Sequence, residues 1–412
     1  MRRLWSVSAA VLVVASGCGA SIGPTPGNDR SEPPATPIAT THSTGVAATP
    51  RPTVAPTQAP PGPLDIGPNG AIVFYRTNDA REFNVGFMIN PDGSGEHELL
   101  EQLVSGVWSP DRRTLAFPWG DWETGKARPA VIHADGTGFA VLDSQPDLVL
   151  DQIPIAWSPD GARIFLTGTG PESIVATSDV GLYSVRSSDG GELTHLVAVP
   201  DGFRELLAVS PEATHVLITR QRPDDTDRYL YEVDIDGSHE RKVSPVDPDI
   251  QLIDFDWWDD ASEAWSPDGT RVAFSAADVS TDTPVSLWVS ALDGKEPREI
   301  VGSDVGATTV RWSPDGKWIA FTSKFRTGAQ LWKVRPDGTG LKQLTNHDDG
   351  SYSVMPVWSP DSSRLLFQRQ YGTGPITLWT MRGDGTEQVQ LSATPLAADL
   401  IGGYAWWPAP PA

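Results

Sequence analysis

Two short stretches of the sequence combine tryptophan with several carboxylates, residue types that together could bind a ligand or carry out chemistry. The first stretch reads FPWGDWETGKARP and the second reads IDFDWWDDASEAW. Their candidate residues are Trp119, Asp121, Trp122, Glu123, Asp254, Asp256, Trp257, Trp258, Asp259 and Asp260. Aromatic rings flanked by carboxylates suit a cationic peptide, a sugar ring or a cation. We predict a ligand or partner face at these residues.

The same residues also allow two other interpretations. A glycosidase would need two carboxyls about 5–10 Å apart across a pocket, and Asp121 or Glu123 facing Asp256 or Asp259 could supply them. A purely structural interpretation has the tryptophans cap the ends of structural units while the acids keep the loops soluble. No constellation of the sequence has the pattern of a catalytic site, so no catalytic residue is assigned.

Metal and cofactor motifs are missing from the sequence. The seven histidines have no HxH or HExxH spacing. The segment EVDIDGSHERKV begins like a calcium loop, but Val243 stands where a bidentate glutamate is needed, so a hairpin turn is favoured. Phosphate loops, dinucleotide fingerprints and Cys/His nucleophile pairs are also missing. We expect neither a metal nor a cofactor.

A repeated phrase indicates the elements that position these stretches. Residues 264–275 read AWSPDGTRVAFS. Near-copies begin at Trp108, Trp157, Trp312 and Trp358, with a weaker one at Val209. Proline presets φ at the second turn position, and Asp-Gly tolerates turn geometry. Each phrase therefore predicts a strand that ends at tryptophan, a tight turn, and a second strand.

A second signature, an apolar strand ending in Asp-Gly, occurs seven times and also predicts hairpins. Its aspartates are Asp92, Asp135, Asp189, Asp236, Asp293, Asp337 and Asp384. The first phrase has only six copies, but GPNGAIVFYR and YAWWPAPPA near the two termini look like the halves of a seventh unit. In that unit Trp406 would take the tryptophan position. A ring closed by pairing its last strand with its first requires this division.

Seven units of four short strands, with a period near fifty residues, predict an all-β fold: a seven-bladed β-propeller over residues 66–412. Pairing of the C-terminal and N-terminal strands closes the ring. The loops between the second and third strands of a blade share a face with the loops that join blades. Both tryptophan-rich stretches are therefore expected on one face.

The N-terminal residues predict export and a tether. Two arginines and a short apolar stretch indicate a signal peptide over residues 1–17, too short to span a bilayer. The small residues before Cys18 resemble the lipobox of bacterial lipoproteins, which implies a lipidated Cys18; an ordinary signal peptide with an incidental cysteine is the alternative. Residues 18–65 are rich in proline and threonine, which predicts a disordered tether.

Charge narrows the classes of partner. The chain carries 53 acidic against 31 basic residues, a net charge of -22. Such a protein is not expected to bind nucleic acid by charge, because the phosphate backbone is itself an anion. A cationic partner remains open.

The repeated Trp-Ser-Pro-Asp-Gly phrase resembles the TolB-like family of β-propellers, over about residues 67–407. TolB itself is soluble, has six blades and carries a folded domain before its propeller, so a role in the Tol system does not follow. Some TolB-like proteins are metal-dependent pectate-fragment lyases. Peptidases related to prolyl oligopeptidase add an α/β-hydrolase domain to a similar propeller, and we expect none here, because five residues follow Trp407.

These observations predict an extracytoplasmic protein of the bacterial cell envelope, anchored to the membrane through a lipid at Cys18. Its propeller would be a non-catalytic platform that binds an envelope protein or peptide. The alternative is a carbohydrate-binding or carbohydrate-active envelope protein that acts on a glycan as a lyase or glycosidase does. A third class, a structural spacer, would make neither stretch functional.

Overall fold

The computed structural model describes residues 71–78, 83–101, 106–111, 113–121, 126–133, 136–142, 156–169, 180–198, 203–221, 228–244, 250–252, 265–278, 285–292, 297–323, 328–392 and 404–407. The predicted signal peptide, Cys18 and the predicted tether lie outside these residues. Contacts divide the chain between Val54 and Ala55, and every described residue belongs to the second unit. None of the described residues forms a helix long and apolar enough to cross a bilayer.

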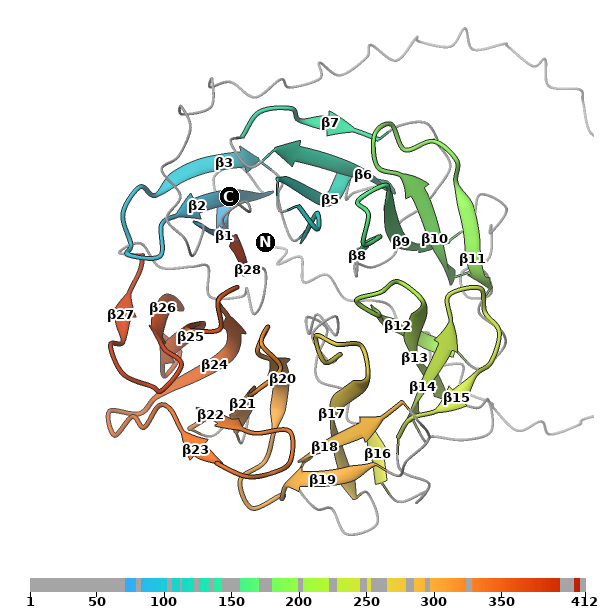
Figure 1. The fold of residues 1–412 in the computed structure, drawn as a ribbon. Coiled ribbons are helices and arrows are strands. Elements are labelled where there is room, and N and C mark those ends of the chain that lie inside the picture. Colours follow the sequence, from blue (N-terminus) through green and yellow to red (C-terminus); the bar gives the residue numbers. More distant parts are fainter. Residues whose placement is uncertain are drawn as a thin grey trace, which may run out of the picture. The chain divides into compact units, whose positions relative to one another are not determined.

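The described strands form seven four-stranded antiparallel sheets, the blades, around a central axis (Figure 1). Listed from the innermost strand outward, blade 1 has β28 (Tyr404–Trp407), β1 (Ala71–Asn78), β2 (Phe83–Ile89) and β3 (His97–Glu101); blade 2 has β4 (Val107–Trp108), β5 (Thr114–Asp121), β6 (Lys126–His133) and β7 (Ala140–Val141); blade 3 has β8 (Ala156–Trp157), β9 (Arg163–Thr169), β10 (Val180–Arg186) and β11 (Thr194–Ala198); blade 4 has β12 (Phe203–Val209), β13 (His215–Gln221), β14 (Arg228–Asp234) and β15 (Arg241–Lys242); blade 5 has β16 (Ile250–Leu252), β17 (Arg271–Asp278), β18 (Ser286–Ala291) and β19 (Arg298–Val301); blade 6 has β20 (Thr308–Trp312), β21 (Ile319–Ser323), β22 (Gln330–Val334) and β23 (Lys342–Gln343); blade 7 has β24 (Ser351–Trp358), β25 (Arg364–Tyr371), β26 (Thr377–Arg382) and β27 (Val389–Gln390). The prediction of an all-β, seven-bladed propeller is confirmed.

Ring closure follows the predicted division of one blade between the two ends of the chain. β28 pairs with β1, and Trp406 lies opposite Ile72. In blades 2 and 6 the repeat tryptophans lie opposite Leu115 and Ile319 in the same way. Trp406 therefore occupies the tryptophan position of blade 1, as its sequence context predicts.

The serine of each repeat phrase organises the turn that follows it. In blade 6, the Ser313 hydroxyl donates to the Asp315 carboxylate at 2.7 Å and accepts from the backbone N–H of Trp318 at 2.9 Å. The backbone N–H of Ser313 also donates to the carbonyl oxygen of Trp318 at 2.8 Å. Buried polar groups require such partners, so the turn itself explains why serine and aspartate recur in the phrase.

The repeat tryptophans pack between neighbouring blades. Trp265, Trp312 and Trp358 are all buried within clusters that combine residues of two blades. The indole of Trp157 also donates a hydrogen bond of 3.0 Å to the carbonyl oxygen of Val107 in the preceding blade. Their role is to hold adjacent blades together.

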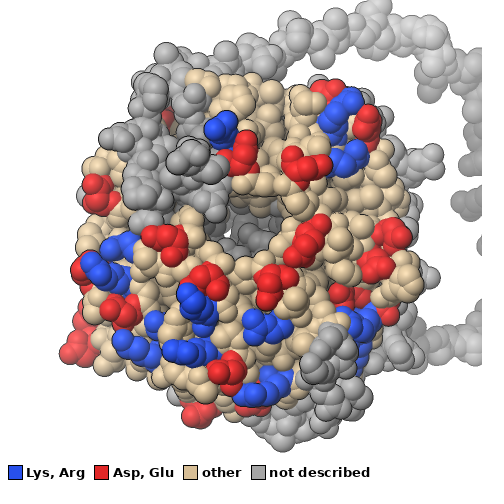
Figure 2. All heavy atoms as spheres, in the orientation of Figure 1, with Lys and Arg blue, Asp and Glu red and all other residues tan. Residues whose placement is uncertain are grey.

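Because successive strands alternate in direction, the turns after the first strand of blades 2 to 7 and after the third strand of each blade lie on one face of the propeller. We call this the turn face; blade 6 contributes residues 313–317 and 336–339 to it. Acidic side chains gather around the opening of the central hollow on this face, and basic side chains gather over blades 5 to 7 (Figure 2). The end of β5 that carries Trp119 and Asp121 lies at the opposite face.

Candidate functional site

The structure describes only part of the predicted partner face. Trp119 is half-buried on β5, and its ring centroid lies 4.9 Å from that of Phe139 and 6.4 Å from that of Phe117. Asp121 ends the same strand with its backbone paired to Lys126. The other predicted residues lie outside the described part of the chain: Trp122, Glu123, Asp254, Asp256, Trp257, Trp258, Asp259 and Asp260. The Asp121 side chain likewise lies outside it.

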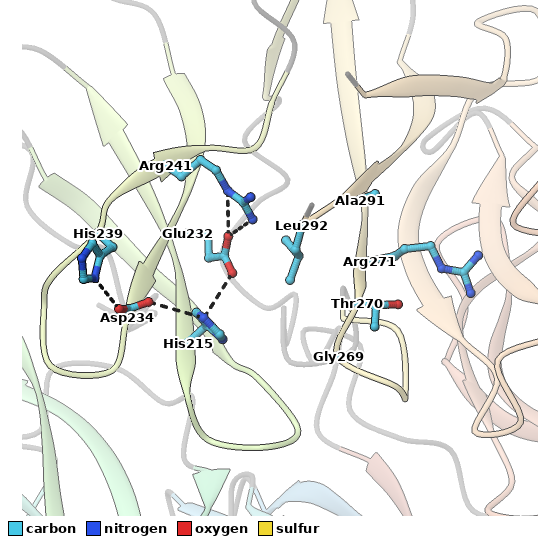
Figure 3. Close-up of a pocket in the computed structure, with 10 residues that line it drawn as sticks. All are labelled: His215, Glu232, Asp234, His239, Arg241, Gly269, Thr270, Arg271, Ala291 and Leu292. Atoms are coloured by element: carbon cyan, nitrogen blue, oxygen red, sulfur yellow. Dashed lines mark hydrogen bonds and ion pairs between the residues drawn. The ribbon is translucent and has the colours of Figure 1, made fainter. Parts of the chain in front are cut away.

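A groove between blades 4 and 5 on the turn face is the candidate site that the structure does describe (Figure 3). Its volume is about 760 Å³. The lining residues are His215, Glu232, Asp234, His239, Arg241, Gly269, Thr270, Arg271, Ala291 and Leu292. Blade 4 supplies the charged wall, and blade 5 supplies a wall with the apolar side chains of Ala291 and Leu292.

Hairpin register builds the charged wall. β13 begins at His215, which lies opposite Asp234 at the end of β14. Side chains two residues apart in a strand share a face, so Glu232 points the same way as Asp234. β15 then brings Arg241 opposite Glu232. The tight turn from Asp234 to Gly237, closed by a backbone hydrogen bond of 2.8 Å, confirms the hairpin favoured over a calcium loop.

Glu232 is the most deeply buried acid of the groove, with 5% of its surface exposed. The guanidinium of Arg241 binds its Oε2 from both Nε, at 3.1 Å, and Nη2. The Nε2 atom of His215 lies 3.7 Å from its Oε1. A buried carboxylate requires such compensation, because leaving it unpaired would be strongly destabilising.

Asp234 is more accessible and stands between two histidines. His239 Nδ1 lies 2.8 Å from Asp234 Oδ2, and His215 Nε2 lies 3.4 Å from Oδ1. The hydrogen bond from His239 is the largest cause that lowers the pKa of Asp234, followed among the lowering causes by the bond from Ser238. Asp234 is therefore ionised at neutral pH. The His239 side chain is largely exposed, so a cationic group of a partner can displace it from Asp234.

The chemistry of the groove is that of recognition by charge and apolar contact. A lysine or arginine side chain fits such a groove, because its apolar stem can lie on Leu292 while its cationic end reaches Asp234. Among the described residues, no group of three or more His, Cys, Asp or Glu side chains is arranged to hold a metal ion.

Sequence reasoning did not single out His215 and His239. Both were judged as scattered histidines, because the motif patterns depend on short spacings along the chain. The signal that could have found them is the pairing of strands. When the strand that begins at His215 is aligned antiparallel to the strand that ends at Asp234, these two residues lie opposite each other. Long-range register, rather than local spacing, assembles this site.

Comparison with known proteins finds a family model that matches part of the repeat. Residues 255–398 match the TolB beta propeller domain. The chain is 32% identical over 116 residues to the uncharacterized peptidase YuxL of Bacillus subtilis (strain 168), covering 27% of this chain and 17% of that protein. It is 33% identical over 79 residues to the Tol-Pal system protein TolB of Syntrophus aciditrophicus (strain SB), covering 19% of this chain and 17% of the relative. The chain thus spans less than a fifth of the length of both relatives.

Solved structures share the fold at low identity. An oligogalacturonate lyase in complex with manganese superimposes with a TM-score of 0.56 and 14% identity, covering 75% of this chain and 90% of the lyase chain. The β-propeller domain of the Trilobed protease from Pyrococcus furiosus gives a TM-score of 0.56 and 15% identity, covering 80% and 94% of the two chains. At this identity the likeness concerns the fold alone.

Proposed function

Because the chain carries a TolB-like β-propeller, we propose that it is a bacterial cell-envelope protein whose turn face binds a protein or peptide without catalysing a reaction. Cys18 would anchor it to the membrane through a lipid, and residues 18–65 would hold the propeller away from the bilayer. Proteins named for the Tol-Pal system among its partial relatives support an envelope location.

The groove between blades 4 and 5 carries this proposal. It places the ionised Asp234 opposite the apolar Leu292 on a rigid framework of paired strands. A basic side chain of a partner would replace His239 at Asp234 and form a charge-assisted hydrogen bond there. The net charge of -22 would also attract a basic partner at long range.

A binding role suits Asp234 better than a role in acid catalysis. A general acid at neutral pH needs a carboxyl whose pKa is raised toward 7. The pKa of Asp234 is instead lowered, chiefly by the hydrogen bond from His239. The group is thus fitted to hold a cation rather than to donate a proton.

The proposal is tested by titrating the full chain with a lysine-containing peptide and with the same peptide in which glutamine replaces each lysine. Asp234→Asn should weaken binding of the lysine peptide about tenfold, the loss of one charge-assisted contact. Asp236→Asn is the matched control, because Asp236 lies in the same turn without lining the groove. Equal affinities for both peptides, or equal effects of both variants, would reject the groove as the binding site.

Two further measurements test the lipid anchor at Cys18 and the carbohydrate alternative separately. Metabolic labelling with palmitate should mark the wild-type protein and not a Cys18→Ser variant, which should leave the membrane fraction. Titration with oligogalacturonate tests the carbohydrate alternative. Release of unsaturated products from it would replace the binding role with a lyase activity.

A further inference from the structure

The turn end of each blade has three positions that meet in space, and their residue types differ from blade to blade. The first is the opening residue of the second strand, and the second is the residue opposite it on the third strand. The third follows the Asp-Gly turn and has a left-handed backbone, with φ of 54° at Glu192, 51° at His239, 69° at Gly340 and 52° at Glu387. Blade 4 uses these positions for His215, Asp234 and His239.

Blade 3 uses the three positions to bind its own carboxylate. Arg163 and Arg186 lie opposite each other in the β9–β10 register. Glu192, at the third position, approaches Arg186 Nη1 at 2.8 Å and Arg163 Nη1 at 3.5 Å. Glu192 therefore contacts both arginines, and Asp189 pairs with Arg186 as well.

Blade 7 repeats this arrangement. Arg364 and Arg382 are paired in register, and Glu387 lies 2.8 Å from Arg382 Nε and 3.6 Å from Arg364 Nη1. The same geometry in two separate blades shows that the third position places a glutamate carboxylate between the other two side chains.

Blade 6 has the cations without the glutamate. Gly340 stands at the third position. Trp318, just before β21, and Arg335, just after β22, stand at the places in the sequence repeat that Arg364 and Arg382 hold in blade 7. Arg335 Cζ lies 5.0 Å from the centroid of the Trp318 ring, and Lys333 Nζ lies 3.9 Å from it. Among the ion pairs of the described residues, none includes Arg335 or Lys333.

The surroundings leave this end of blade 6 positive. Lys342 Nζ donates to the carbonyl oxygen of Asp384 at 2.8 Å, and no ion pair among the described residues includes Lys342. The nearby carboxylates of Asp337 and Asp384 are held within their own turns by Thr339 and Thr386. Basic side chains accordingly gather over this sector of the turn face, in a chain that is acidic as a whole (Figure 2).

We propose that the end of blade 6, formed by Trp318, Lys333, Arg335 and Gly340, binds an aspartate or glutamate side chain of a partner protein. That carboxylate would take the place that Glu192 and Glu387 fill in blades 3 and 7. The internal occupants are glutamate side chains of a peptide backbone, which favours an acidic peptide over an acidic glycan. This inference rests on the proposed role of the turn face in protein binding, and it adds a second contact of opposite charge.

The test uses the full chain and a synthetic peptide in which glutamate alternates with serine, with glutamine replacing glutamate in the control peptide. The glutamate peptide should bind, and Arg335→Gln should weaken it about tenfold. Gly340→Glu should weaken it at least as much, because the new glutamate occupies the site from within. The backbone permits this change, since Glu192 and Glu387 adopt a left-handed φ at the same position. The added Cβ would lie 3.3 Å from Trp318 Cη2, so the indole ring must shift by a few tenths of an ångström.

Arg382→Gln in blade 7 is the matched control, because it also removes one positive charge but from an arginine already paired with Glu387. Unchanged binding by Arg382→Gln together with weaker binding by both blade 6 variants supports the proposal. Equal effects of Arg335→Gln and Arg382→Gln, or a folded Gly340→Glu protein that binds normally, would overturn it. Binding of oligogalacturonate but not of the glutamate peptide would also overturn it.

Binding of the lysine peptide to the groove between blades 4 and 5 shows whether a negative result at blade 6 rejects only the blade 6 site or also the proposed function. If the blade 6 variants change nothing while Asp234→Asn still weakens the lysine peptide, only the second contact is wrong. If neither peptide binds, both proposals are wrong.

Discussion

The indole Nε1 of Trp358 donates a hydrogen bond of 3.2 Å to the carbonyl oxygen of Arg311, in the inner strand of the preceding blade. Trp157 makes the equivalent bond of 3.0 Å to Val107. In both cases the acceptor is the residue before the neighbouring repeat tryptophan. The tryptophans of blades 3 and 7 thus join each of these blades to the preceding one by a polar contact as well as by apolar packing; this contact is buried for Trp358 and partly buried for Trp157.

Trp358→Phe tests the contribution of this contact. The change keeps an aromatic ring but removes the indole donor to the carbonyl oxygen of the buried Arg311. One hydrogen bond contributes about 0.5–1.5 kcal/mol, so the free energy of unfolding should fall by that amount. Urea unfolding followed by tryptophan fluorescence measures it.

Trp379→Phe is the control, because the Trp379 indole donates at 2.9 Å to the Thr377 hydroxyl within its own strand. This half-buried bond joins no blades, and its loss should cost less. Equal losses in the two variants would show that the contact between blades contributes nothing of its own.

Ala213→Gly should stabilise the protein. Ala213 has a φ of 55° in the turn of blade 4, where Gly316 of blade 6 has a φ of 68°. An L-residue in this region costs roughly 1–2 kcal/mol, partly offset by the greater freedom of glycine in the unfolded chain. We expect a gain of about 0.5–1 kcal/mol, measured as a rise in the urea midpoint.

The reciprocal variant Gly316→Ala should be destabilised to a similar extent. An added Cβ would find space, with Pro267 Cδ as its nearest neighbour at 3.9 Å, so the backbone conformation alone would determine the result. A stabilised Gly316→Ala protein would contradict the explanation.

The fold follows from local turn chemistry, which is why the sequence predicts it well. Asp-Gly turns and the split unit at the termini determine seven blades and the pairing of Trp406 with Ile72. The charged sites depend instead on which residues meet across strands. His215 and Asp234 are distant in sequence, and the importance of Gly340 appears only when the structure aligns it with Glu192 and Glu387.

The repeat serines should make stability depend on acid pH. The Ser266 hydroxyl donates to Asp268 at 2.5 Å, the largest cause that lowers the pKa of Asp268 in the folded protein. An acid with a lower pKa in the folded state stabilises that state above its unfolded pKa, and the contribution is lost as the pH falls through the folded pKa. The destabilisation caused by Ser266→Ala should therefore be larger at pH 5 than at pH 2.5.

Ser210→Ala provides the comparison in blade 4, where the hydroxyl of Ser210 accepts from the backbone N–H groups of Thr214 and His215. No carboxylate accepts from this hydroxyl among the described residues. Urea unfolding at the two pH values should show the same destabilisation for Ser210→Ala at both. A pH-independent effect of Ser266→Ala would exclude Asp268 as the origin.

An ion pair within blade 1 is hydrogen-bonded to Ser392 at the end of blade 7. Arg76 Nη1 lies 2.6 Å from Glu96 Oε1, and the Ser392 hydroxyl, just after β27, donates to Glu96 Oε2 at 3.0 Å. The Arg76 side chain is 12% exposed and lies over the rings of Phe74 and Phe87. Both the charge and the stem of Arg76 therefore act at the junction of the two blades.

Arg76→Met should keep the apolar packing and leave Glu96 without its partner. Removing one member of a fully buried pair costs 3–5 kcal/mol, and Glu96 is partly exposed, so a loss of about 1–3 kcal/mol in unfolding free energy is expected. Arg186→Met is the control, because Arg186 and its partners Asp189 and Glu192 are exposed, where ion pairs contribute little. Urea unfolding compares the two variants. If Arg186→Met lowers the free energy of unfolding as much as Arg76→Met, the contacts of Arg76 at the junction of blades 1 and 7 contribute no more than an exposed ion pair.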